Sequence, residues 1–218
     1  MTTTLLELLA RSRELGFLGP GPVGPHEEHA LAFASLIDEP PARALDLGAG
    51  GGLPGLVLAA RCWPATEWTF LDAQERRTDF LSQAVDELGL GDRVTVITER
   101  AEVVGHDPEH RGAYDLVVAR SFGSPPVVAE CAAPLLRPGG HLVVSEPPGD
   151  ATDRRWPSSG LALVGLGPAT LHRVPADGDG ALDRPDAPVV HLVRTTLESP
   201  CGARFPRRVG VPTKRPLF

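Results

Sequence analysis

The feature that most constrains the fold is a repeated alternation, between residues 43 and 146, of short apolar runs with segments of helical periodicity. Runs that are apolar throughout are typical of parallel strands covered by helices on both faces. The pattern therefore predicts an α/β fold with a doubly wound, mostly parallel sheet. The predicted strands are 44–47, 68–72, 93–97, 114–119 and 141–146, and the predicted helices are 54–62, 74–88, 100–104 and 125–136.

The segments on either side of this core have different patterns. Apolar segments at 162–174 and 188–195 are joined by a loop too short for a helical crossover, so we expect a C-terminal antiparallel hairpin. At the N-terminus, helices are predicted at 3–15 and 26–37, separated by GPGPVGP at 19–25, where proline and glycine disfavour regular structure. We expect an N-terminal helical region or lid at 1–42, a ligand-binding α/β domain at 43–200 and a tail at 201–218. The segments 147–160 and 175–188 are expected to be surface loops.

Composition limits the possible environments of the chain. No stretch approaches the roughly 20 apolar residues that a bilayer span needs, and the N-terminus lacks a secretory signal pattern, so we expect a cytoplasmic protein without membrane contact. Cys62, Cys131 and Cys201 are widely spaced, and Pro108 interrupts the helix that would place His106 and His110 on one face. Neither disulfides nor a metal site is expected.

Charge is distributed unevenly along the chain. The formal net charge of −7 disfavours a surface that is basic everywhere, which unselective nucleic-acid binding would require. From Arg204 to Phe218, however, the chain has five cations and no acid. This basic tail is a candidate contact for an anionic partner, although genomic bias toward arginine is a simpler source of its arginines.

A glycine-rich turn follows the first predicted strand. It runs Asp46-Leu-Gly48-Ala-Gly50-Gly-Gly52-Leu-Pro54-Gly55 and opens a helix. Glycines permit positive φ and close approach of a ligand to the backbone, and a helix start presents free N–H groups. Asp72 ends the second predicted strand, 20 residues after Gly52, where a carboxylate can accept both hydroxyls of a ribose.

Two ligand classes fit this turn. Gly50-x-Gly52-x-x-Gly55 matches a dinucleotide fingerprint, which alone is a weak signal. Asp46 instead suits the ammonium of a methionine moiety, Pro54 removes an N–H that a phosphate would use, and the predicted hairpin is unusual for nicotinamide enzymes. We therefore expect a methyltransferase that uses S-adenosylmethionine, with a nicotinamide-dependent oxidoreductase and a non-catalytic binding module as alternatives.

The residues expected to hold the cofactor lie at the ends of the first four predicted strands. Backbone groups of Arg100 and Ala101 are expected to contact the adenine, whereas the side chain of Glu102 either faces the cofactor or caps a short helix. The expected set is Asp46, Gly48, Ala49, Gly50, Gly52, Leu53, Asp72, Ala73, Arg100, Ala101, Glu102 and Arg120.

Four segments together resemble a known family: DLGAGGGLPGLVLA, LDAQERRTDFLSQAVDELGL, the ARSF at 119–122 and the tail RFPRRVGVPTKRPL. They are similar to the bacterial small-subunit ribosomal RNA guanine-N7 methyltransferases, the RsmG or GidB family, over roughly 43–146 and the tail. The resemblance implies a class I, Rossmann-like fold and transfer of a methyl group to N7 of one guanine in 16S rRNA. Guanine N7 has a free lone pair at neutral pH, so alignment and desolvation suffice and no general base is expected.

Within this resemblance, Arg120 is the candidate catalytic residue. Because N7 must face the methyl group, the expected contact of Arg120 is with guanine O6 or a phosphate, and the alternative is a structural salt bridge. The tail would stay extended between its prolines and glycines and contact RNA phosphates, unless it is merely solvated. The expected nucleic-acid contacts are Arg207, Arg208, Lys214 and Arg215.

The chain departs from the family pattern on the acceptor side. The family's Asn-Leu-Thr segment is replaced by GFLGPGPVGPHEEHALAF, and SEPPG lacks the lysine usual after the fifth strand. A paralogue that methylates a small molecule or another RNA is therefore the alternative function. His26 and His29 either border the acceptor pocket or form a solvated helix start, and Trp156 either stacks on a base or covers the core.

Overall fold

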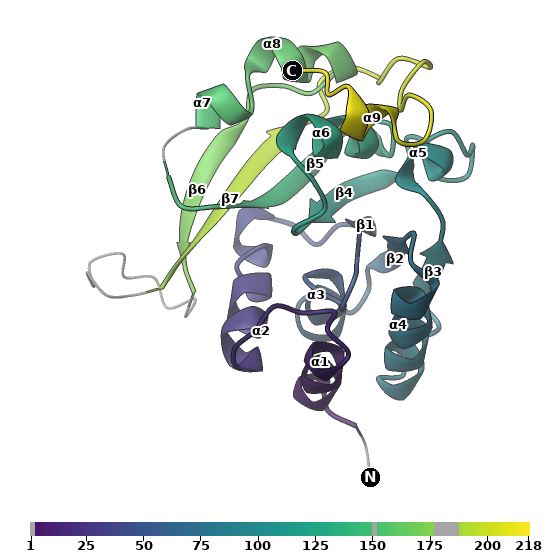
Figure 1. The fold of residues 1–218 in the computed structure, drawn as a ribbon, viewed down its shortest axis with the longest axis vertical. Coiled ribbons are helices and arrows are strands. Elements are labelled where there is room, and N and C mark those ends of the chain that lie inside the picture. The colour runs from purple at the N-terminus through teal and green to yellow at the C-terminus, as the bar shows by residue number, and fades with distance from the viewer. Residues whose placement is uncertain (1–2, 150–151, 177–187) are drawn as a thin grey trace.

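Seven strands form one sheet in the order β3-β2-β1-β4-β5-β7-β6 (Figure 1). The computed structural model describes residues 3–149, 152–176 and 188–218. Most of the predicted loop at 175–188 lies outside these ranges. The strands are β1 Arg43–Leu47, β2 Glu67–Asp72, β3 Val94–Thr98, β4 Tyr114–Ala119, β5 Leu136–Glu146, β6 Thr170–Pro175 and β7 Val189–Thr196.

Pairing within the sheet confirms the predicted mixture of directions. β1 pairs in parallel with β2 and β4, β2 pairs in parallel with β3, and β4 pairs in parallel with β5. β7 is antiparallel to both β5 and β6. The chain order changes direction at β1 and β4, so their carboxyl ends form the switch point where α/β sheets bind ligands.

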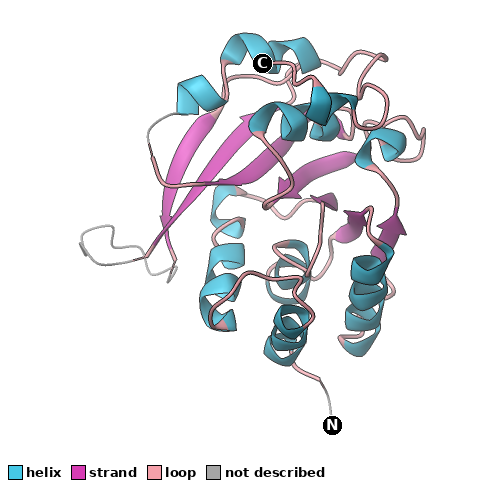
Figure 2. Cartoon of the chain, viewed as in Figure 1, coloured by secondary structure: helices cyan, strands magenta, loops and turns pink. Residues whose placement is uncertain are grey.

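Helices cover both faces of the sheet (Figure 1, with helices in cyan in Figure 2). α1 to α4 lie on one face, and α5, α6, α8 and α9 lie on the other; the two faces bury separate apolar clusters. The helices are α1 Leu5–Glu14, α2 Val23–Leu31, α3 Gly55–Arg61, α4 Glu75–Glu87, α5 Ala101–Val104, α6 Pro125–Ala132, α7 Thr152–Arg155, α8 Ser158–Leu161 and α9 Val211–Lys214, with 3-10 turns η1 Ala34–Leu36 and η2 Ala162–Val164.

α1 illustrates how local sequence and packing combine. Thr4 caps the helix, since its hydroxyl accepts the Glu7 N–H while the Glu7 carboxylate accepts the Thr4 N–H. Leu8 and Leu9 are fully buried in the apolar cluster on this face of the sheet, each contributing about 1.5–3 kcal/mol by burial. The helix predicted at 3–15 is therefore confirmed, and its buried face sets the position of Ser12, which contacts the glycine turn.

Several boundaries in the first two thirds of the chain differ from the prediction, and the helix predicted at 26–37 ends at Leu31. α2 begins at Val23 and includes Pro25, because a proline in the first helical turn removes only an N–H that has no partner there. The expectation that all of 19–25 is irregular was wrong. The helix predicted at 125–136 ends at Ala132, and β5 starts early because Leu136 pairs with Tyr114.

The last third also has more local structure than predicted. The segment 147–160 contains α7 and α8 rather than only loop, and the strand predicted at 162–174 is confined to β6 after the η2 turn. Trp156 is 2% exposed and donates its indole N–H to the Glu146 carboxylate at 3.0 Å. It therefore covers the core and has no free face on which a base could stack.

The C-terminal segment is folded onto the domain rather than extended, which corrects the prediction. Phe205 is 3% exposed in the core on the α6 face, and α9 forms one helical turn. The Arg207 side chain is bound to Glu130 of α6, which is fully buried. Buried ion pairs of this kind fix the path of a chain that local sequence alone would leave extended.

The described residues contain neither a membrane-spanning helix nor a cluster of metal-binding side chains. In 3–149, 152–176 and 188–218, no helix is long and apolar enough to cross a membrane. The same ranges contain no group of three or more histidine, cysteine or acidic side chains arranged to hold a metal ion.

Candidate functional site

The glycine turn follows β1, as the sequence predicts, and lies at the switch point between β1 and β4. Gly48 and Ala49 donate their N–H groups to the carbonyl of Leu71 at 2.8 and 3.0 Å, which ties the turn to β2. From the other side, the Ser12 hydroxyl of α1 donates to the Gly51 carbonyl at 2.9 Å. The turn needs positive φ at three glycines, Gly48, Gly50 and Gly52.

Asp46 lies beneath this turn and is completely buried. Its Oδ2 accepts the Gly55 N–H at 2.7 Å, whereas Oδ1 has no hydrogen-bond partner. Burial raises the pKa of Asp46 to about 7; nearby Asp72 also raises it, and the Gly55 hydrogen bond and Arg120 oppose the rise. A buried oxygen without a partner is costly, so this carboxylate is suited to receive a cationic group such as an ammonium.

Asp72 ends β2 with its carboxylate held by backbone groups on both sides. Oδ2 accepts the Gly50 N–H at 3.0 Å, and Oδ1 accepts the Gln74 N–H at 2.9 Å. Arg77 of α4 approaches Oδ2 at 3.5 Å. These contacts fix the carboxylate at the rim of the turn, and each oxygen retains acceptor capacity for a ribose hydroxyl.

Arg100, Ala101 and Glu102 follow β3 and begin α5. The Glu102 carboxylate accepts two bonds from the Arg100 guanidinium, at 3.0 and 3.2 Å, and one from the Gly210 N–H at 2.9 Å. Burial alone would raise the pKa of Glu102, but these hydrogen bonds outweigh it and lower the pKa. The side chain is therefore engaged with Arg100 and with the tail, and Glu102 also lines the cavity beside Asp72.

Arg120 ends β4 on the opposite side of the turn. One guanidinium nitrogen lies 3.0 Å from His26 Nδ1, and the other, Nη1, is buried without a partner. Burial lowers the pKa of Arg120, whereas the negative charge of Asp46 raises it. The Arg120 charge in turn opposes the rise in the pKa of Asp46. The next residue, Ser121, has φ of 58°, a backbone strain that is frequent at functional sites.

α2 places two histidines near Arg120. Because the arginine can only donate, His26 Nδ1 accepts, and His26 Nε2 then donates to the Gly19 carbonyl at 3.3 Å. Burial, then Arg120 and His26, lower the pKa of His29 to about 4, so this ring is neutral at pH 7. Of the two predicted readings, the position of His26 agrees with a border of the acceptor side.

Two adjoining cavities form one cleft along the carboxyl ends of β1, β2 and β4. They have volumes of about 190 and 250 Å³ and share Gly48, Arg77 and Ser121. The first cavity is lined by Asp72, Ala73, Arg100, Ala101 and Glu102, and the second by Ala49, Gly50, Leu53 and Arg120, together with Phe17, Leu18, Gly19 and His26. The structure thus brings the predicted cofactor residues to one cleft, with Asp46 and Gly52 supporting the turn from below.

Several cleft residues were not predicted. Arg77 lies in the first turn of α4 after Asp72, a position that the strand-then-helix pattern could have singled out. Phe17 and Leu18 had no such signal, because they reach the cleft only through the packing of α1 on the turn. Phe122 belongs to the ARSF segment and packs directly above Gly48.

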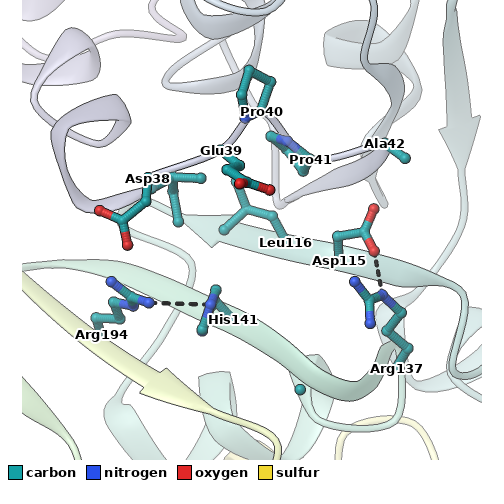
Figure 3. A pocket seen from close by; sticks show the side chains of 12 residues that line it. Asp38, Glu39, Pro40, Pro41, Ala42, Asp115, Leu116, Arg137, His141 and Arg194 are labelled. Carbon is teal, nitrogen blue, oxygen red and sulfur yellow. Dashed lines mark hydrogen bonds and ion pairs between the residues drawn. The ribbon is translucent and has the colours of Figure 1, made fainter.

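A larger cavity, about 490 Å³, lies at the opposite end of the strands, where β4 and β5 begin (Figure 3). Its charged groups contact one another: Arg137 pairs with Asp115, and Arg194 lies 3.1 Å from His141 Nε2. Among the described residues, no lining side chain of this cavity has a buried polar atom without a partner. The cleft at the glycine turn, with unpartnered atoms on Asp46, Arg77 and Arg120, is the better candidate for ligand binding.

Comparison with known proteins identifies the family. A family model described as "GidB: rRNA small subunit methyltransferase G" matches residues 26–146, which include every residue predicted to hold the cofactor. The chain belongs to this family. A "Ribosomal RNA small subunit methyltransferase G" of Parasynechococcus marenigrum is 39% identical over 80% of this chain and 67% of its own length. Another of that name, from Deinococcus radiodurans, is 40% identical over 81% of this chain and 66% of its own length.

Solved structures agree with the fold. An O-methyltransferase from Bacillus cereus, determined in complex with SAH, has a TM-score of 0.59 at 17% identity over 88% of this chain and 89% of its own. The O-methyltransferase TomG from Streptomyces achromogenes, in complex with SAM, has a TM-score of 0.57 at 20% identity, covering 88% and 90%. The GidB-family chain therefore has a class I methyltransferase fold, and its family makes it a methyltransferase with S-adenosylmethionine as cofactor. The nicotinamide alternative is excluded.

Proposed function

We propose that this protein methylates N7 of a guanine in 16S rRNA, acting in the cytoplasm on the RNA or on the small ribosomal subunit. The observation that carries the proposal is the cleft at the glycine turn, where Asp72 and Arg120 line adjoining cavities above the buried Asp46 carboxylate, one oxygen of which has no partner. Membership of the GidB family supplies the substrate class.

The residues present fit the cofactor. Asp46 Oδ1 would hold the methionine ammonium, and Asp72 would accept the ribose hydroxyls. The residues Arg100 and Ala101 line the first cavity beside Asp72, on the side expected to hold the adenine. When bound, S-adenosylmethionine supplies an electrophilic methyl group on a sulfonium.

The chain's own contribution to the reaction is alignment and exclusion of water. Guanine N7 needs no deprotonation, so no residue has to act as a general base. Arg120, held by His26, lines the second cavity and has a buried Nη1 without a partner; its guanidinium would bind either the carboxylate of the cofactor or O6 of the acceptor guanine. If Arg120→Lys weakens S-adenosylhomocysteine binding, the first contact is supported; a higher KM for RNA alone would support the second.

The decisive experiment combines labelling with an active-site variant. The protein is incubated with methyl-labelled S-adenosylmethionine and either deproteinised 16S rRNA or 30S subunits, and the labelled base is mapped. Asp72→Ala removes two charge-assisted hydrogen bonds, so S-adenosylhomocysteine affinity should fall by about 10- to 100-fold and labelling should be lost at limiting cofactor. Asp92→Ala, an exposed acid in the turn before β3, is the matched control and should behave as wild type.

A second acceptor class is favoured by one specific observation. The segment that departs from the family pattern lines the second cavity, on the side proposed for the acceptor. Its lining residues are Phe17, Leu18, Gly19 and His26. A paralogue acting on a small molecule or another RNA would have this property. Labelling of no base in 16S rRNA or in 30S subunits, with cofactor binding intact, would replace the first proposal by this one.

A further inference from the structure

The cofactor cleft and the basic tail meet at a single buried side chain. Glu102 lies at the start of α5, beside Ala101, and its side chain is only 2% exposed. One of its oxygens, Oε1, accepts both the Arg100 guanidinium at 3.0 Å and the Gly210 backbone N–H at 2.9 Å. The same carboxylate therefore orders a cleft residue and a residue of the tail 108 positions later.

Further contacts hold the tail rigidly to α5 and α6. Glu130, whose side chain is fully buried, accepts the Arg207 backbone N–H and two guanidinium bonds at 2.6 to 2.8 Å. Arg111, after α5, donates to three tail carbonyls: Cys201, Gly202 and Phe205. The tail is therefore bound to α6 and to the segment after α5, in addition to its contact with Glu102 at the start of α5.

The opposite side of the tail is cationic and exposed. Arg208, Lys214 and Arg215 are exposed, and within the described part of the chain none of them forms an ion pair. Exposed cations without acidic partners are available to phosphates. The tail thus has one side fixed to the cofactor cleft and another free to bind a polyanion.

From this arrangement we propose that Glu102 is a positioning residue, which joins the tail to the adenine end of the cleft and couples phosphate binding at the tail to cofactor affinity. Its carboxylate holds Arg100 and Gly210 together through hydrogen bonds. The proposal is that both the cofactor and the RNA bind more tightly when these two bonds are formed. Coupling of this kind is reciprocal, so RNA must tighten cofactor binding by the same factor as cofactor tightens RNA binding. The RNA half rests on the proposed function; the positioning half concerns the cofactor alone.

The test measures S-adenosylhomocysteine affinity by calorimetry, with and without saturating deproteinised 16S rRNA. Wild type should bind S-adenosylhomocysteine about five- to tenfold more tightly with RNA, a coupling of ordinary size. Glu102→Ala should weaken binding about fivefold without RNA and lose the RNA response. Arg208→Ala should reduce only the response to RNA, and the control Glu109→Gln, an exposed acid beyond α5, should change neither value.

A second measurement does not depend on the folding of a variant. In wild type, S-adenosylhomocysteine should slow hydrogen exchange of the Gly210 amide, because this N–H donates to Glu102. Unchanged exchange at Gly210, or unaltered affinity in a folded Glu102→Ala, would overturn the positioning role. RNA that binds without changing affinity for S-adenosylhomocysteine would overturn the coupling. If no RNA binds, the proposed function fails, while the Glu102 result without RNA still decides the positioning role.

Discussion

At the scale of single residues, Asp46 combines complete burial with an incomplete set of hydrogen bonds. One oxygen accepts the Gly55 N–H and the other has no partner. An unpartnered buried oxygen does not stabilise the folded protein. The ligand-free protein therefore keeps a destabilising group at the place where a cofactor ammonium would compensate it. This is the usual balance between stability and function at a binding site.

This balance predicts a dependence on pH. With its pKa raised to about 7, native Asp46 retains a proton that the unfolded chain releases above about pH 4, so the unfolding free energy should fall as pH rises through this window. Asp46→Asn keeps the acceptor for Gly55 and removes the charge. At pH 8 and without cofactor it should be more stable than wild type by about 1–3 kcal/mol.

Urea unfolding between pH 5 and 8 measures the effect, and calorimetry should show that the same Asn variant loses affinity for S-adenosylhomocysteine. Asp92→Asn, exposed and distant, serves as the control. Equal pH slopes for wild type and Asp46→Asn would mean that Asp46 is ionised throughout the range in the native protein.

At the scale of elements, the strand–turn–helix unit around the cofactor was predictable because its signals are local. An apolar run, a series of glycines and an acid at each strand end occupy neighbouring positions of the sequence. The end of α6 and the folded tail were not predictable, because Leu136 pairs with Tyr114 and Arg207 with Glu130, which are 77 residues apart. Contacts between residues so far apart in the sequence produce no local pattern of apolar residues from which they could be predicted.

The tight packing of the turn gives a matched pair of glycine substitutions. A Cβ at Gly55 would lie 2.6 Å from Asp46 Oδ2 and 2.8 Å from Phe70 Cε1, both buried, so Gly55→Ala should cost about 1–3 kcal/mol of unfolding free energy. Gly24, in the first turn of α2, has open space around it, and Gly24→Ala should be neutral or stabilising by up to about 1 kcal/mol. Thermal unfolding of both variants tests this, and a harmless Gly55→Ala would contradict the described packing.

At the scale of the whole molecule, helix α1 and the C-terminal segment lie on opposite faces of the central sheet (Figure 1). α1 supports the glycine turn from one side, and the C-terminal segment supports α5 and α6 from the other. The sequence predicted a basic tail that contacts RNA, but it could not distinguish the cations that face solvent from those that hold the fold together.

Two neighbouring arginines make that distinction testable. Arg207→Ala leaves the buried Glu130 carboxylate without its guanidinium partner and should lower the unfolding free energy by about 3–5 kcal/mol. Arg208→Ala, at an exposed position, should stay within about 0.5 kcal/mol of wild type. For binding to 16S rRNA, Arg208→Ala should instead reduce the slope of log affinity against log salt by about 0.7–0.9, the loss of one phosphate contact.

Chemical unfolding and filter binding across a salt series provide the two measurements. A stable Arg207→Ala protein with weakened RNA binding would assign this arginine to the RNA after all. An unchanged salt slope in Arg208→Ala would show that the exposed face of the tail is not the surface that RNA contacts.

The way α1 meets the glycine turn also limits how this chain can vary. A side chain at position 51 would collide with Ser12 and Leu18, whereas one at position 48 would collide with the ring of Phe122. Each glycine therefore depends on a different neighbour, so substitutions should be rescued by different second changes. Smaller residues at 12 and 18 together should restore a protein carrying Gly51→Ala but not one carrying Gly48→Ala, and variation in the first 20 residues should be correlated with variation in the turn that they cover.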